Sequence, residues 1–196
     1  MDKNEIIRET LRLMFAVENA SGDIKDIPNI QDYIDKIDGS LNRAIIRVCQ
    51  AKKAGTKTIT ISKKEDLEEL KSGLDLTTLE EKPKILKIDK VVVIDKNGTI
   101  SPYNDFYTLD YKTIVIDWVS KEDKIKIFYY PSNVELTELR EDVAAILPLF
   151  IKSELYEEDE ASLALQARSL FESALQAIEM NPQTIQTKVT NVFGVY

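Results

Sequence analysis

The clearest pattern of apolar positions lies between Val134 and Ile178. In two consecutive segments apolar residues recur three or four positions apart, which gives one apolar face to an amphipathic helix. The first set is Leu136, Leu139, Val143, Ile146, Leu147, Phe150, Ile151 and Leu155, and the second is Leu163, Ala167, Leu170, Phe171, Ala174, Leu175 and Ile178. The acidic run at 157–160 between them is long enough only for a turn, so we expect two antiparallel helices in a hairpin.

Two more helices are predicted near the N-terminus, at residues 3–18 and 30–53. Gly39 lies inside the second and is expected to bend or divide it, because glycine costs about 1 kcal/mol in a helix interior. The second helix is the basic member of the set, with Lys25 before it and Lys36, Arg43, Arg47, Lys52 and Lys53 along it. We therefore expect the second helix to be the electrostatic partner of the acidic hairpin.

The period of the apolar residues changes from helical to strand-like between residues 56 and 131. The predicted strands are residues 56–62, 85–95, part of 99–112, 112–119 and 124–130. The turn sequence at 120–123 predicts that the last two strands pair as a hairpin, and Asn97-Gly98 is a second turn signal. A short helix is predicted around 65–71.

This order of elements predicts an α+β fold that is mainly α. We expect an antiparallel four-helix bundle with a small antiparallel β-sheet inserted between the second and third helices, and an extended C-terminal arm. The predicted parts are the N-terminal helices of the bundle (1–55), the β-sheet insertion (56–132), the C-terminal helical hairpin (133–180) and the arm (181–196), in one structural domain overall.

The predicted arm, NPQTIQTKVTNVFGVY, is rich in threonine and valine, a composition that favours strands. Its apolar side chains are Ile185, Val189, Val192, Phe193, Val195 and Tyr196. A chain end is usually polar. These residues therefore indicate that the arm either folds back onto its own sheet or adds a strand to the edge of another subunit.

Composition excludes several kinds of chemistry. The chain has 196 residues, 43% of them hydrophobic, but no apolar run of about 18 residues that would span a membrane. Its charged N-terminus lacks the apolar core of a secretory signal. It has no histidine, which rules out a Ser-His-Asp or Cys-His site and argues against zinc. The single Cys49 cannot form an internal disulfide and is expected to be a buried, inert thiol, and the six scattered glycines form no phosphate-binding loop.

The net charge of −8 is concentrated in one region of the chain. Residues 134–180 hold eleven acidic and three basic residues, 3 − 11 = −8, and the rest of the chain is neutral. This region is either a solvated acidic face or a surface that repels an anionic partner. A calcium site at 157–160 is a weaker alternative, because the run lacks the alternating spacing of an EF-hand loop. The aromatic residues from Tyr103 to Tyr111 suit packing or subunit contact better than base stacking, because their surroundings are neutral to acidic.

Four passages together carry a resemblance to a known family. They are IDGSLNRAIIRVCQ (37–50), ILKIDKVVVID (85–95), YKTIVIDWVSKEDKIKIFYYP (111–131) and ELTELREDVAAILPLFIKSELYEEDEASLALQARSLFESALQAI (135–178). In this order they resemble the head-to-tail adaptor proteins, also called connector or neck proteins, of tailed bacteriophages, particularly the short-tailed kind. The resemblance is one of pattern and order over most of residues 3–180, without an invariant motif, and residues 63–82 and the arm depart from it.

The resemblance implies a structural virion protein rather than an enzyme, with no cofactor, metal or membrane. About twelve copies would form a ring beneath the portal protein, and the ring would link the capsid to a downstream tail or ring protein. The protein would assemble in the host cytoplasm and reside in the neck of the virion. DNA would pass through the ring without sequence-specific binding.

The resemblance also suggests roles for two groups of residues. Portal or subunit contacts would come from Ile185, Val189, Val192, Phe193 and Tyr196. The channel-facing acidic surface would be Glu157, Glu158, Asp159 and Glu160. A channel that attracted phosphates would hold DNA by releasing its counterions, so an acidic lining would let the duplex slide.

Two other classes of protein fit the same sequence. One is a cytosolic helical-bundle scaffold or chaperone that binds a partner helix, which should form a small oligomer with an exposed apolar groove. The other is an enzyme built on carboxylates and tyrosines, which should have a concave pocket and carboxyl groups with raised pKa values.

Overall fold

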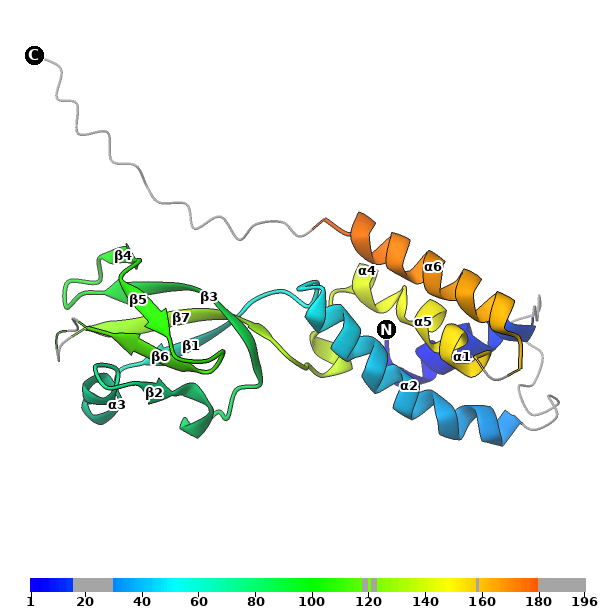
Figure 1. Cartoon of the computed structure of the whole chain (residues 1–196), viewed down its shortest axis with the longest axis horizontal. Coiled ribbons are helices and arrows are strands. Elements are labelled where there is room, and N and C mark those ends of the chain that lie inside the picture. The colour runs from blue at the N-terminus through cyan, green and yellow to red at the C-terminus, as the bar shows by residue number, and fades with distance from the viewer. Residues whose placement is uncertain (16–29, 118–119, 121–122, 158, 180–196) are drawn as a thin grey trace, which may run out of the picture.

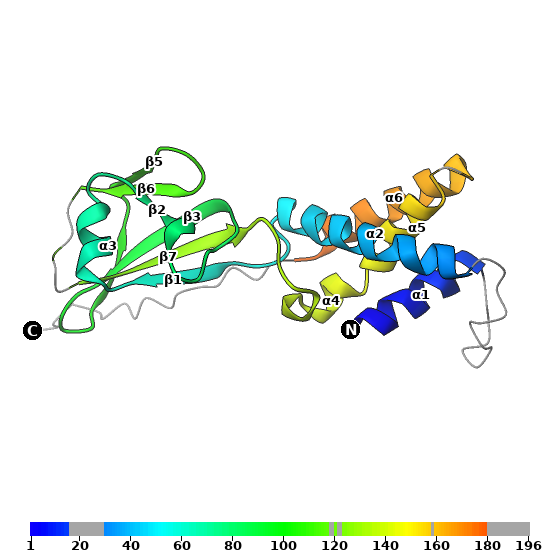
Figure 2. The same cartoon turned by 90° about the horizontal axis from the view of Figure 1, so that it is seen from below.

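The computed structural model describes residues 1–15, 30–117, 120, 123–157 and 159–179. These residues form two lobes, a helical lobe at one end of the molecule and a sheet lobe at the other (Figures 1 and 2). Each lobe encloses its own cluster of buried hydrophobic side chains. The chain crosses from the helical lobe to the sheet lobe after residue 50 and returns after residue 131.

The helical lobe is built around one short apolar helix, α5 (Leu147–Leu155). Its other elements are α1 (Lys3–Phe15), α2 (Ile30–Gln50), α4 (Glu141–Ala144), α6 (Ala161–Ala177) and a 3₁₀ turn at Leu136–Glu138. Helices α1, α2 and α6 all pack against α5. Phe150 of α5 meets the fully buried Phe171 of α6 edge to face, with ring centroids 5.1 Å apart. With neighbours on several sides, α5 needs apolar residues around most of its surface.

Residues 134–155, predicted to form one helix, are divided into three pieces. Proline has no backbone N–H and clashes with the preceding turn inside a helix, so it is accepted only in a helix's first turn. Helix α5 accordingly has Pro148 in its first turn, and α4 and the 3₁₀ turn precede it as separate elements. Gly39, in contrast, does not divide α2, which is continuous from Ile30 to Gln50.

The predicted pairing of the basic helix with the acidic hairpin is confirmed. Arg43 of α2 donates from Nε to Glu154 of α5 at 2.6 Å. Arg47 donates from Nε and Nη2 to the two carboxylate oxygens of Glu172 in α6, at 2.8 and 2.6 Å. Helix α2 is thereby tied to both helices of the α5–α6 hairpin, and charge-assisted, two-point contacts of this kind fix its orientation.

The sheet lobe contains two antiparallel sheets. The first has the order β1 (Lys57–Ile61), β7 (Lys124–Pro131), β3 (Ile85–Ile94) and β4 (Ile100–Tyr103). The second has the order β2 (Leu74–Asp75), β6 (Thr113–Ile116) and β5 (Phe106–Thr108). Helix α3 (Lys64–Glu69) and a 3₁₀ turn at Leu76–Thr78 complete the lobe. Alternate residues of β1 and β7 face the core that these elements share with β6, so the predicted period of two is confirmed there.

The predicted hairpin of residues 112–119 and 124–130 is wrong. Strands β6 and β7 belong to different sheets, and β7 pairs with β1 and β3 instead. Ile114, Val115 and Ile116 of β6 are all buried. A strand buried on both faces needs cover on both sides, and β6 finds it by leaving the first sheet for the second.

The predicted fold class, a four-helix bundle with a small inserted sheet, is also wrong. Seven described strands form two sheets around a separate hydrophobic core, and the C-terminal helical region is α4, α5 and α6 rather than two helices. The pattern of apolar positions predicts which face of an element is buried but not which distant strand it meets. The predicted arm, 181–196, lies outside the described residues. No described helix is long and apolar enough to cross a membrane.

Candidate functional site

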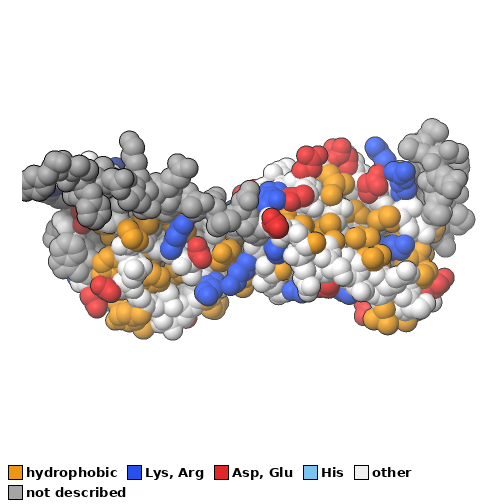
Figure 3. Space-filling view, turned by 90° about the horizontal axis from the view of Figure 1, so that it is seen from above, with side chains coloured by type: hydrophobic (Ala, Val, Ile, Leu, Met, Phe, Trp, Pro, Cys, Tyr) orange, Lys and Arg blue, Asp and Glu red, His pale blue; other side chains and the backbone are white. Residues whose placement is uncertain are grey.

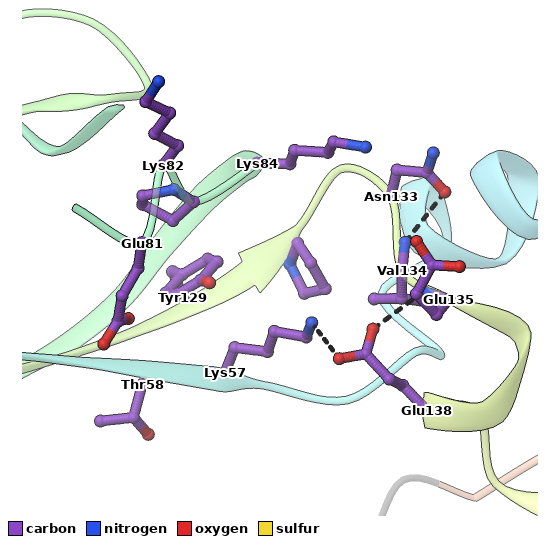
Figure 4. A pocket seen from close by; sticks show the side chains of 12 residues that line it. Lys57, Thr58, Glu81, Lys82, Lys84, Tyr129, Asn133, Val134, Glu135 and Glu138 are labelled. Carbon is purple, nitrogen blue, oxygen red and sulfur yellow. Dashed lines mark hydrogen bonds and ion pairs between the residues drawn. The ribbon is translucent and has the colours of Figure 1, made fainter. Parts of the chain in front are cut away.

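A pocket lies where the two lobes meet, with a volume of about 450 Å³ (Figure 4). It is formed by the first residues of β1, the loop before β3, the end of β7 and the segment that leads to the 3₁₀ turn. Its lining residues are Lys57, Thr58, Glu81, Lys82, Pro83, Lys84, Tyr129, Pro131, Asn133, Val134, Glu135 and Glu138. The lining combines apolar side chains, such as Pro83 and Pro131, with charged ones, such as Lys57 and Glu138.

Two ionisable groups of this junction pocket, Lys57 and Glu138, pair with each other. Lys57 donates to Glu138 at 2.6 Å, and Glu138 also accepts the backbone N–H of Glu135 at 2.8 Å. These hydrogen bonds, that of Lys57 first, lower the pKa of Glu138, whereas burial raises the pKa of the Tyr129 phenol. Wherever a carboxyl pKa departs from its ordinary value in the described part of the chain, it is lowered. The Lys57–Glu138 pair joins β1 of the sheet lobe to the 3₁₀ turn of the helical lobe.

The acidic run forms the turn between α5 and α6, at the end of the helical lobe that points away from the sheets (Figure 1). Glu157, Asp159 and Glu160 are exposed, and Glu158 lies outside the described residues. The Tyr156 hydroxyl donates to the carbonyl of Met14 at 2.7 Å and ties the turn to α1. Acidic groups beside the N-terminus of α6 also interact favourably with the helix dipole. The described Cys, Asp and Glu side chains form no group of three or more that could hold a metal ion.

The outward side of α6 carries no charge. We call it the α6 outer face: the exposed residues Ala161, Ser162, Leu165, Gln166, Ser169, Leu170, Ser173, Gln176 and Ala177. The helix has two charged residues, and both are paired inward, Arg168 with Glu154 at 2.8 Å and Glu172 with Arg47. Seen from the side on which α6 lies, hydrophobic side chains gather across the middle of the helical lobe (Figure 3).

Sequence reasoning missed this face because it placed Leu170 in the hairpin core. Leu170 is 53% exposed and Leu165 is 72% exposed, while Ala164 and Ala167 are buried. Phe171 and Leu175 are buried as well, so the inward side of α6 is apolar and two further large apolar side chains, Leu165 and Leu170, lie on its exposed side. The low number of charges between Ala161 and Ala177, which are Arg168 and Glu172 alone, was the signal that could have revealed it.

A groove of about 610 Å³ lies elsewhere on the helical lobe. It is lined by Met1, Glu5, Arg8, Glu9, Leu13, Glu141, Ala145, Pro148 and Leu149. These residues come from α1, α4 and α5, and α1 packs on a different side of α5 from α6 (Figures 1 and 2). This groove and the α6 outer face are therefore separate surfaces of the helical lobe.

The other residues singled out in the sequence differ in burial. Tyr103 and Phe106 pack against the core of the sheet lobe, whereas Tyr107 and Tyr111 are 51% and 62% exposed. Cys49 is buried, as predicted, and burial raises the pKa of its thiol to about 11. The predicted contact residues Ile185, Val189, Val192, Phe193 and Tyr196 lie outside the described residues.

Comparison with known proteins finds no protein-family model and no curated sequence that matches this chain.

Proposed function

We propose that this protein is a subunit of the ring-shaped head-to-tail adaptor of a tailed bacteriophage. The observation that carries the proposal is the α6 outer face. A solvated protein surface has charges on about 25 to 35% of its residues, and 31% of this chain is charged. A two-lobed, acidic protein that leaves one long helix face uncharged has a surface suited to burial against another chain.

The groove on the helical lobe provides a second, different surface for a head-to-tail contact between copies. If the α6 outer face of one copy packs into the groove lined by Leu13 and Leu149 of the next, two different surfaces meet. Such a heterologous contact repeats from copy to copy and closes into a ring when the rotation between neighbours allows it. A two-fold dimer would instead pair one surface with itself.

The two lobes match two tasks in the neck of a virion. In the proposed ring the helical lobes form the wall, and the sheet lobes project toward the downstream tail protein. The arm, with Phe193 and Tyr196, reaches the portal or a neighbouring copy. The acidic turn at 157–160 faces the channel, where it repels the phosphates of passing DNA.

Electron microscopy of the purified chain tests the proposal. We expect class averages of closed rings of about twelve subunits around a central hole. The variant Leu165→Glu/Leu170→Glu places two charges on the α6 outer face and should abolish the rings, because burying an unpaired charge is costly. Leu109→Glu, which changes a leucine of similar exposure (65%) in the sheet lobe, should keep them.

The same images separate the adaptor from the scaffold alternative. A scaffold that binds a partner helix in its groove would appear as small particles in both variants. Rings that survive Leu165→Glu/Leu170→Glu would support a ring protein but would remove the α6 outer face as its contact.

A further inference from the structure

The four-stranded sheet has a face that its hydrophobic core does not use. Its buried apolar side chains, such as Ile59, Val91 and Ile127, point toward α3 and the second sheet. Figure 2 shows both of these on the same side of β1, β7 and β3. The opposite side, which we call the outer sheet face, belongs to none of the described hydrophobic clusters.

Strand register places four lysines on the outer sheet face. Side chains two residues apart share a face, so Lys124 and Lys126 of β7 lie there with Phe128 and Tyr130. Directly paired residues also share a face. Lys90 pairs with Phe128 and Lys87 pairs with Tyr130, which adds both lysines of β3.

The remaining groups leave this face strongly basic. Thr58 and Thr60 of β1 pair with Phe128 and Lys126 and contribute hydroxyl groups. Lys52, after α2, lies over the Tyr130 ring at 5.3 Å. Asp89 is the only acidic residue in β1, β3, β4 and β7, and it hydrogen-bonds Tyr130.

Several basic residues of the sheet lobe are neutralised by an acidic partner, but in the described residues the lysines of the outer sheet face are not among them. Lys57, Lys63 and Lys112 each form an ion pair within 4 Å. Within the described ranges, none of the ion pairs involves Lys52, Lys87, Lys90, Lys124 or Lys126. Their positive charge is therefore available to an outside partner.

Protection of sheet edges does not explain them. Natural sheets place lysine on edge strands to prevent pairing with other chains. Here β7 and β3 are the two central strands, and β1 and β4 form the edges. Central strands have no free edge to protect, so edge protection does not account for these lysines.

We propose that the outer sheet face binds the backbone of duplex DNA without regard to sequence. Lysine ammonium groups and threonine hydroxyls are common phosphate partners. Lys90 and Lys126 lie 4.7 and 5.9 Å from the centre of the Phe128 ring, so the ring is capped and does not stack on bases. The choice of DNA among polyanions rests on the proposed adaptor function, in which DNA passes the protein. The acidic turn lies at the end of the helical lobe that points away from the sheets, so the repelling surface and the outer sheet face meet the duplex at different places.

Fluorescence anisotropy with a labelled duplex of about 20 base pairs and arbitrary sequence tests this inference on the full chain. Each phosphate contact contributes about −0.9 to the slope of log K against log salt concentration. Four contacts give a slope of about −4, and Lys90→Gln/Lys126→Gln should reduce it to about −2. The matched control Lys64→Gln/Lys71→Gln removes two exposed lysines elsewhere in the sheet lobe and should leave binding unchanged.

Three results would overturn the inference: no binding at 50 mM salt, equal losses in both double variants, or tighter binding to poly-glutamate of matched charge, which would indicate an acidic protein partner. Light scattering on the same samples keeps this test apart from the adaptor proposal. Assembled protein that does not bind DNA contradicts the inference alone. DNA binding by a protein that never assembles contradicts the adaptor alone.

Discussion

At the scale of single residues, the Arg47–Glu172 pair shows how charge orients the helices. Its guanidinium uses two donors toward two carboxylate oxygens, and the side chains are 38% and 29% exposed. The hydrogen bond from Arg47 lowers the pKa of Glu172 in the folded chain. The pair therefore stabilises the fold above the unfolded pKa of the carboxyl group, and this contribution is lost as the pH falls through the lower folded value.

Replacing Arg47 should lower the free energy of unfolding by an amount that depends on pH. Arg47→Met is expected to lower the free energy of unfolding by about 1 kcal/mol at pH 7, and its difference from the unmodified chain should shrink below about pH 4, as Glu172 becomes protonated in both states. Urea denaturation at pH 7 and pH 3 measures both values. Lys3→Met, which removes a pair with both side chains more than half exposed, should cost less. An Arg47→Met cost that is equal at the two pH values would show that the ion pair is not its cause.

At the scale of elements, the local pattern of residues predicted where strands and helices form, but it did not predict which distant strands pair. Strands β1, β3 and β7 and helix α3 form near their predicted positions, because alternation and turn residues act over a few neighbours. Local pattern could not predict that β7 pairs with β1, because the two strands lie more than sixty residues apart in sequence. Proline chemistry predicts that a helix begins at Pro148. The apolar residues on both sides of Pro148 keep a helical period, however, and this period predicted one continuous helix.

The candidate surfaces illustrate the same limit. The outer sheet face draws Lys87 and Lys90 from one strand and Lys124 and Lys126 from another. In the sequence, acidic residues such as Asp89 and Glu122 lie close to these lysines, so the net charge of the region is close to zero. Only strand pairing separates the two signs of charge. The α6 outer face was easier to recognise, because it lies within one continuous segment, Ala161–Ala177, that has only two charged residues.

At the scale of the whole molecule, the two separate hydrophobic clusters predict two unfolding units. Phe171 is fully buried in the helical lobe and Leu70 is fully buried in the sheet lobe. Phe171→Ala should cost about 3 to 5 kcal/mol and Leu70→Ala about 2 to 5 kcal/mol. Calorimetry should show two transitions, each variant lowering the midpoint of one. A single transition lowered by both variants would mean that the lobes unfold together.

The central claim, that this chain is a ring subunit, is tested most directly by its mass in solution. Light scattering at high micromolar concentration should give one species of about twelve times the 22.3 kDa of a single chain. A chain ending at Asn181, which lacks Val189, Phe193 and Tyr196, should fall to a monomer if the arm fastens neighbouring copies. A tight dimer in both cases would contradict the account, because a two-fold contact closes on itself and leaves no surface with which to build a ring.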